Sequence, residues 1–272
     1  MPAVVWLVLL FVVPLVIMLS WSLKTCNPAS GACTMTWNWG ELPRQVSLYR
    51  TEFFTSLEYG AAATLVDLVL SFPIAYWIAF YGGRKKNFFL MMLLVPFFVS
   101  FVIRTLVWEF ILSPSGFFLT FLRHANLVTS SFHVLGTGSA VIAGLAYNYL
   151  PFTALPLYVA LERIDRRVLE AAYDLYASRR EAFMRVILPL TIPGIFAAFL
   201  LTFIPAFGDY VNQQILGGTS STMIGTVIQN TFLVTGDYAA GSALSVVVLV
   251  ISLLGIWLYS RVLGSRSIEE YL

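Results

Sequence analysis

Length and composition place much of the surface of this chain outside water. Of its 272 residues, 59% are hydrophobic and only 11% are charged, whereas soluble domains carry about 25% charged residues. The net charge of +2 is too small for a nucleic-acid-binding protein, which needs a basic surface. The composition therefore predicts a membrane protein in contact with a lipid bilayer and excludes nucleic acid as its partner.

Several apolar segments are long enough to cross a bilayer. A membrane helix needs roughly 20 apolar residues, and unpaired backbone groups are costly in lipid, which leaves helices or closed barrels. These segments are too uniformly apolar for barrel strands, which alternate. We predict an all-α fold, with residues 1–272 as a single transmembrane domain of about six helices, at about Pro2–Leu23, Tyr59–Phe80, Phe88–Leu112, Gly138–Leu161, Pro189–Val211 and Ala240–Val262.

The first segment is interpreted as a retained span. It has no basic residue before its apolar stretch, and that stretch exceeds the 7–15 residues of a signal peptide. The sequence begins abruptly at this helix, so a natural N-terminal tail could precede it. Cys26 and Cys33 follow and could form a disulfide if their loop is extracytoplasmic, or remain two free thiols. A zinc site is not expected, because no histidine lies near them.

The distribution of Lys and Arg predicts the orientation. On one side lie the turn after the second span, the loop after the fourth and the C-terminus. The opposite side holds Lys24, Arg44, Arg50 and Arg123. Because positive charge favours the cytoplasmic side, we expect both termini inside a multi-pass protein of the cell membrane. The 11 basic residues on the cytoplasmic side are Arg84, Lys85, Lys86, Arg163, Arg166, Arg167, Arg179, Arg180, Arg185, Arg261 and Arg266.

The longest cytoplasmic connection, about residues 162–188, is predicted to fold into two short helices. Asp165 is a suitable N-cap for the first, whose apolar residues recur at helical spacing. Ser178 and Glu181 form an S-x-x-E capping box that begins the second. Such an element must cover its apolar face. It would lie either in the headgroup layer or in a groove on a cytoplasmic partner.

This loop resembles the EAA loop of the permease subunits of binding-protein-dependent ATP-binding cassette (ABC) importers. The resemblance rests on Glu170-Ala171-Ala172, Ala177-Ser178, Phe183, Leu188-Pro189 and Pro193-Gly194, and it extends over about residues 56–263. The segments AYNYLPFTALPLYVALERIDRRVLEAAYDLYAS and FIPAFGDYVNQQILGG resemble the spermidine/putrescine branch in particular. The resemblance implies a type I ABC importer permease with a cytoplasmic coupling loop. The solute would be a polyamine or another small organic cation, or else a different small solute.

The same resemblance implies a set of partners. These are a second related permease, two cytoplasmic ATPases that bind ATP and Mg, and an extracytoplasmic substrate-binding protein. The chain itself is expected to be no enzyme and to hold no cofactor, and it has no G-x-x-x-x-G-K-[ST] phosphate loop. The family usually has Gly where this chain has Tyr176, so Tyr there should be strained in a left-handed turn, or the turn must be built differently. The residues implied in ATPase docking are Glu170, Ala171, Ala172, Asp174, Tyr176, Ala177 and Ser178.

Ionisable residues inside spans are candidates for contact with the solute, because they are costly in lipid. Asp209 is the best of them, with Tyr210, Asn212 and Gln213 close by. A carboxylate and an aromatic face suit an organic cation, although a frayed helix end in interfacial water is the alternative. Asp67 would touch the solute or hydrogen-bond to another helix.

Arg104 has the wrong charge for a cationic solute, and Glu109 lies on another face of the same helix. Pro205 and Gly208 would either break or kink the fifth span. Two other classes of membrane protein would carry different signals. A secondary transporter should show inverted repeats and intramembrane ion ligands, and an intramembrane enzyme should show a buried nucleophile or metal pair. The sequence shows no such repeats, a secondary transporter would leave the two-helix cytoplasmic loop unexplained, and no buried nucleophile or metal pair stands out.

Overall fold

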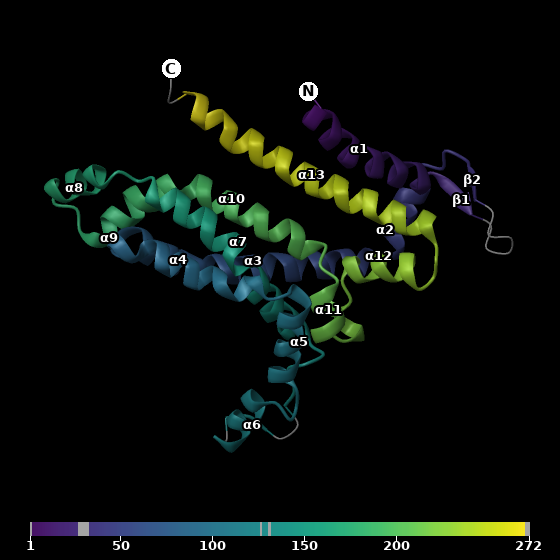
Figure 1. The fold of residues 1–272 in the computed structure, drawn as a ribbon, viewed down its shortest axis with the longest axis horizontal. Helices are drawn as coiled ribbons and strands as arrows, with labels where there is room; N and C mark the ends of the chain where they lie inside the picture. Colours follow the sequence, from purple (N-terminus) through teal and green to yellow (C-terminus); the bar gives the residue numbers. More distant parts are fainter. Residues whose placement is uncertain (1, 27–32, 126, 130–131, 270–272) are drawn as a thin grey trace.

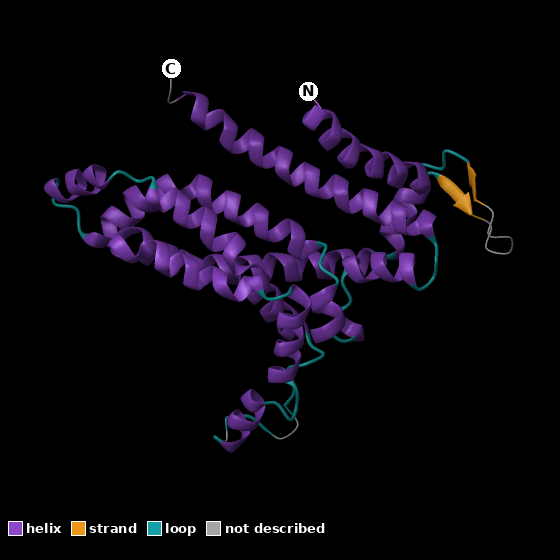
Figure 2. Cartoon of the chain, viewed as in Figure 1, coloured by secondary structure: helices purple, strands orange, loops and turns teal. Residues whose placement is uncertain are grey.

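The computed structural model describes residues 2–26, 33–125, 127–129 and 132–269, and these are mostly helical (Figure 2). The α-helices are α1 (Pro2–Ser22), α2 (Glu41–Leu48), α3 (Arg50–Tyr81), α4 (Lys86–Leu94), α5 (Phe101–Leu112), α6 (Phe117–His124), α7 (Gly138–Glu162), α8 (Arg166–Asp174), α9 (Arg179–Ala182), α10 (Leu188–Phe207), α11 (Val211–Leu216), α12 (Ile224–Leu233) and α13 (Tyr238–Glu269). Shorter turns of 3₁₀ or π helix are η1 (Gly83–Lys85), η2 (Val95–Phe98), η3 (Phe183–Ile187) and η4 (Thr219–Ser221). Strands β1 (Lys24–Cys26) and β2 (Cys33–Met35) form an antiparallel hairpin that the sequence did not predict.

Among the described residues, five helical segments are long and apolar enough to cross a membrane. α1 has 21 residues and coincides with the first predicted span. α7 and α13 match the fourth and sixth predicted spans within a few residues at their starts. α3 has 32 residues and is therefore about 48 Å long, which exceeds a hydrocarbon core of about 30 Å. The five segments are Arg50–Tyr81, Phe101–His124, Gly138–Glu162, Arg179–Phe207 and Tyr238–Leu258.

The third predicted span, Phe88–Leu112, is wrong as a single helix. α4 gives way to the 3₁₀ turn η2, Val99 and Ser100 are extended, and α5 then starts in a new direction (Figure 1). The physical reason is Pro96, which has no N–H for an α-helical hydrogen bond and clashes with the preceding turn. The stretch that is long and apolar enough to cross a membrane is instead Phe101–His124, in which the turn at residues 113–116 separates α5 from α6.

The fifth predicted span ends earlier than expected. α10 stops at Phe207, the chain turns at Gly208, and the short helix α11 begins at Val211. The prediction left a break and a kink open at this point, and the structure shows a break. Because Asp209 falls in this turn, its position depends on where the helix ends.

Three long helices, α3, α7 and α10, pack side by side as the centre of the molecule (Figure 1). Small residues line their contacts. Ala63 of α3 packs in one buried cluster with Ala146 of α7 and Ala206 of α10. The hydroxyls of Thr153 and Thr202 lie 2.6 Å apart between α7 and α10. Small side chains allow close backbone approach and polar ones add hydrogen bonds, which is how helices associate in lipid.

The first and last long helices form a second unit. α1 packs along α13, and the hairpin lies beyond their shared end (Figure 1). The rings of Trp21 and Tyr238 lie 5.8 Å apart there. Cys33 is disulfide-bonded and lies opposite Cys26, the other cysteine of the sequence, in the hairpin register. The structure therefore favours the disulfide over free thiols.

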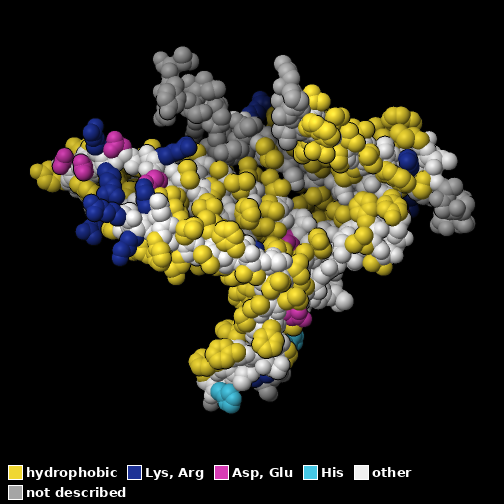
Figure 3. Space-filling model, in the orientation of Figure 1, with side chains coloured by type: hydrophobic (Ala, Val, Ile, Leu, Met, Phe, Trp, Pro, Cys, Tyr) yellow, Lys and Arg dark blue, Asp and Glu magenta, His cyan; other side chains and the backbone are white. Residues whose placement is uncertain are grey.

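Charged side chains gather at one end of the molecule. Dark blue and magenta side chains cluster over α8 and α9, whereas the middle of the molecule is covered by hydrophobic ones (Figure 3). This separation is the layout expected of a protein whose middle faces lipid and whose basic end faces the cytoplasm.

Candidate functional site

Both helix caps predicted for the loop between α7 and α10 are confirmed. Asp165 accepts a hydrogen bond from the Arg167 N–H at 2.9 Å and so caps α8. Ser178 and Glu181 form the capping box of α9, with the Ser178 N–H donating to Glu181 Oε2 at 2.9 Å. Capping satisfies backbone N–H groups that a helix start leaves free. The loop is therefore folded by its own local sequence.

The turn between α8 and α9 has the backbone of a glycine turn, but with tyrosine in the glycine position. Tyr176 has φ +62°. Its N–H donates to the Tyr173 carbonyl at 2.9 Å, and the Ala177 N–H donates to the Ala172 carbonyl at 3.1 Å. This pair of bonds is the Schellman motif, which favours Gly at the left-handed residue. The strain expected at Tyr176 is therefore present, because its backbone is left-handed.

We predict that Tyr176→Gly stabilises this turn. Left-handed backbone costs an L-residue about 1–2 kcal/mol, so removing the Cβ should slow hydrogen exchange of the turn amides by roughly fivefold to thirtyfold. Exchange measured by mass spectrometry on the membrane-embedded protein would show this. Leu175→Gly is the matched control, because Leu175 is also exposed but has φ −85°. Faster exchange in both variants would contradict the strain.

The candidate ATPase-docking residues form one exposed projection. Glu170, Ala171, Asp174 and Ser178 are exposed, and Ala172 and Ala177 are half-buried. Leu175 and Tyr176 at the tip expose 81% and 97% of their surface. Exposed apolar side chains at the tip of a charged loop are unusual unless something covers them.

The base of the projection is fastened to the bundle. Lys86, the first residue of α4, pairs with Glu162 at the end of α7, and this hydrogen bond raises the pKa of the Lys86 ammonium. Arg166 donates to the Phe80 carbonyl at 3.3 Å. Phe183 packs edge-on against Phe72, with ring centroids 5.8 Å apart. A force on α8 or α9 would therefore reach α3 through packed side chains.

A second candidate site lies where α5, α7 and α11 meet, and it is a buried polar cluster around Asp209. Asp209 is 6% exposed. It accepts from the backbone N–H of Asn212 at 2.8 Å, from Asn212 Nδ2 at 3.2 Å and from the Tyr149 hydroxyl at 3.0 Å. Asn148 Nδ2 donates to Asn212 Oδ1 and to Thr105 Oγ1, both at 2.9 Å. The carboxylate is therefore held by neutral donors, and its turn begins α11.

The structure brings some of the predicted solute-pathway residues together and separates others. Asp209 and Asn212 share the cluster, and Tyr210 beside them is 43% exposed. Gln213 points elsewhere, because its Oε1 accepts from Thr226 of α12 at 2.5 Å. Asp67 of α3 is fully buried, and neither of its carboxylate oxygens has a hydrogen-bond partner among the described residues.

Sequence reasoning missed three members of the cluster, which are Thr105, Asn148 and Tyr149. Asn148 and Thr105 are completely buried. The available signal was Asn148 in the middle of an apolar span, since a polar residue there must find partners on other helices. What the sequence could not show is which helices supply them.

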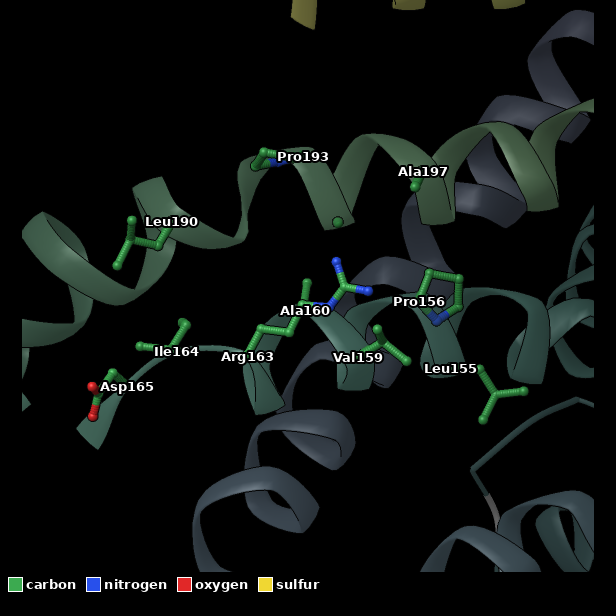
Figure 4. A pocket seen from close by; sticks show the side chains of 11 residues that line it. Leu155, Pro156, Val159, Ala160, Arg163, Ile164, Asp165, Leu190, Pro193 and Ala197 are labelled. Atoms are coloured by element: carbon green, nitrogen blue, oxygen red, sulfur yellow. The ribbon is translucent and has the colours of Figure 1, made fainter. Parts of the chain in front are cut away.

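A groove of about 760 Å³ runs between α7 and α10 towards the coupling loop. Leu190 and Ala197 of α10 face Pro156 and Ala160 of α7, and Arg163 extends its guanidinium into the gap between the helices (Figure 4). A Cβ at Gly194 would overlap that of Ala160. The two helices therefore touch at Gly194 and diverge around it. The Asp209 cluster involves the same two helices, through Tyr149 of α7 and the turn after α10.

Comparison with known proteins identifies the protein family of this chain. Residues 63–263 match the family described as "Binding-protein-dependent transport system inner membrane component". The chain belongs to this family. The match covers most of the 272 residues and includes the coupling loop and the Asp209 turn, so the chain is a permease subunit of an ABC importer.

Individual proteins agree with the family. The chain is 36% identical over 265 residues to the "Spermidine/putrescine transport system permease protein PotB" of Escherichia coli (strain K12), covering 96% of each protein. A solved bacterial ABC transporter for import of the acidic polysaccharide alginate matches with a TM-score of 0.69 and 20% identity, over 97% of this chain and 94% of the other. A second alginate transporter structure, in complex with a pentasaccharide-bound periplasmic protein, matches with a TM-score of 0.65 and 18% identity, over 98% and 92%.

These findings confirm the fold class and the function expected from the sequence. The permease has the type I ABC importer fold, and it is a transport subunit of the inner membrane rather than an enzyme. A self-sufficient secondary transporter and an intramembrane enzyme are both excluded by the family.

Proposed function

We propose that this permease imports polyamines, with spermidine and putrescine as the favoured solutes. The observation that carries the proposal is the 36% identity to PotB over 96% of both chains, because similarity over the full length includes every element that could line a pathway. The buried carboxylate of Asp209 beside the Tyr149 ring supports it, since organic cations are attracted to both.

In this proposal residues 1–272 form one transmembrane domain, which supplies half of the pathway, and a second, related permease supplies the other half. Asp209 is the anionic centre and Tyr210 the exposed aromatic beside it, while Asn212 and Gln213 hold the turn in shape. Asp67 is kept as a second, deeper candidate. The groove between α7 and α10 would carry the solute inward from the cluster.

The two ends of the molecule are proposed to bind different partners. Two cytoplasmic ATPases, which would bind ATP and Mg, dock on Glu170 and its neighbours. An extracytoplasmic binding protein delivers the solute at the opposite end. The basic residues near α8 and α9 support a cytoplasmic position of that end, and hence of both termini.

The test is reconstitution. The chain is co-expressed with a candidate second permease and candidate ATPases, and ATP hydrolysis is measured with a candidate binding protein. Stimulation by spermidine or putrescine, and none by sulfate or an amino acid, is the expected result. An assembled complex that responds to another solute class instead would overturn the polyamine assignment and leave the permease role intact.

We predict that Asp209→Asn lowers polyamine uptake by about tenfold or more. The substitution removes the negative charge that would pair with the ammonium group of the bound polyamine, and losing one charge of a desolvated pair costs on the order of 2 kcal/mol or more. Uptake into proteoliposomes is the measurement. Asp237→Asn is the matched control, since Asp237 is an exposed carboxylate that caps α13 through the Ala240 N–H at 3.0 Å. An equal loss in both variants would remove Asp209 from the pathway.

A further inference from the structure

Arg104 is an unusual residue for the position it holds. It lies on α5, is only 9% exposed, and its Nε and Nη1 atoms have no hydrogen-bond partner among the described residues. A buried guanidinium with unpaired N–H groups is costly. Packing alone would favour an apolar side chain here, so packing does not explain why a cationic residue occupies this position.

Two aromatic rings lie against this guanidinium. Its central carbon lies 4.1 Å from the centroid of the Phe97 ring and 5.7 Å from that of Phe101. The Phe101 ring is 5.9 Å from that of Tyr149, which in turn lies 6.1 Å from Phe152. Rings placed in this way around a cation form the arrangement that recognises organic ammonium groups.

The same rings lead to the carboxylate. Tyr149, whose ring lies 5.9 Å from that of Phe101, donates its hydroxyl to Asp209 Oδ2 at 3.0 Å. Asp209 is not paired with Arg104 and accepts only from neutral groups in the bonds described above. The cluster thus contains a cation on an aromatic surface and a carboxylate one ring away.

We propose that the Arg104 guanidinium occupies the place of a solute ammonium in the empty permease. It is an internal stand-in for the cation, and an entering organic cation must displace it from the Phe97 and Phe101 rings. This inference rests on the proposed function and explains why a cationic residue lines a cation site. The unpaired N–H groups mean that few bonds are lost when the guanidinium leaves.

Competition of this kind reduces the apparent affinity for the solute in proportion to the fraction of time for which the guanidinium leaves the site free. The empty permease would therefore hold the solute weakly, which favours release, and its aromatic surface would stay covered between transport cycles. Removal of the tethered cation should strengthen equilibrium binding, whereas most substitutions at a ligand site weaken it. The direction of the effect separates this role from an ordinary contact.

The experiment measures binding of radiolabelled spermidine to the complete permease–ATPase complex in nanodiscs, without binding protein. Arg104→Gln is expected to lower the half-maximal concentration about tenfold, the factor for a guanidinium that fills the site about nine-tenths of the time. Arg104→Lys should remain near wild type because it keeps a cation. Arg44→Gln, an exposed arginine of α2, controls for net charge.

Stability provides a second readout. Arg104→Met is expected to assemble and to melt no lower than wild type, because it replaces unpaired buried N–H groups with an apolar chain. Weaker or unchanged spermidine binding in Arg104→Gln, beside clear binding by wild type, overturns the inference alone. Loss of the second permease from the Gln and Met variants also overturns it, and assigns Arg104 to a charge pair between subunits. An intact wild-type complex that does not bind or respond to spermidine contradicts the proposed function as well.

Discussion

Glu170→Arg is expected to abolish stable association of the permease with its ATPases. Glu170 is exposed on α8, and the helix is held in place by the Asp165 cap and by the Arg166 bond to α3. The substitution reverses a charge on a rigid projection without touching the bundle. Losing one member of a charged pair at an interface costs about 2–5 kcal/mol, which weakens binding from roughly thirtyfold to several thousandfold.

Co-purification of the ATPases with a tagged permease measures this association, and thermal unfolding of the permease shows that the spans remain folded. The matched control is Glu58→Arg, because Glu58 is an exposed carboxylate near the opposite end of α3. ATPases retained by Glu170→Arg at wild-type amounts, with transport unchanged, would show that this loop is not their docking site.

Gly225→Ala is expected to have the largest effect on stability of any single methyl addition near the polar cluster. Gly225 is in the first turn of α12. A Cβ there would overlap the carbonyl oxygen of Gly208 and lie 2.7 Å from that of Asp209. Backbone atoms cannot rotate away as a side chain can, so α12 or the Asp209 turn must shift. Overpacking of this kind costs about 1–3 kcal/mol.

The shift should also reduce transport, because the Asp209 turn holds Asn212 and Tyr149 in place. Thermal unfolding in detergent and uptake by proteoliposomes are the two measurements. Gly255→Ala on α13 is the control, since a Cβ there has no atom within 4 Å. Alanine at that position should leave uptake unchanged and raise stability slightly through helix propensity. Equal behaviour of the two variants would mean that the contact at Gly225 is loose.

Much of the fold and the two capped helices of the coupling loop could be predicted from the sequence, because local properties determine them. The spans that became α7 and α13 depend on uninterrupted apolar runs, which lipid selects wherever they occur. The caps at Asp165 and Ser178 involve residues two or three positions apart. The sequence left the turn at Tyr176 open between a strained left-handed residue and a different geometry, and the structure shows the left-handed residue. The motif around Glu170 was sufficient to indicate the family.

Tertiary structure alone decided how the spans break and what their polar residues contact. The division of the third span followed Pro96, whose presence did not reveal that α5 would turn away from α4. Thr105 and Asn212 meet across 107 residues of sequence. Arg104 lies near Phe101 because the two are three residues apart on α5, whereas its contact with Phe97 crosses the break before α5. Hydrophobicity fixes how deep a helix lies in lipid, but not its rotation or its neighbours. Those depend on side-chain packing between segments distant in the chain, which no local pattern records.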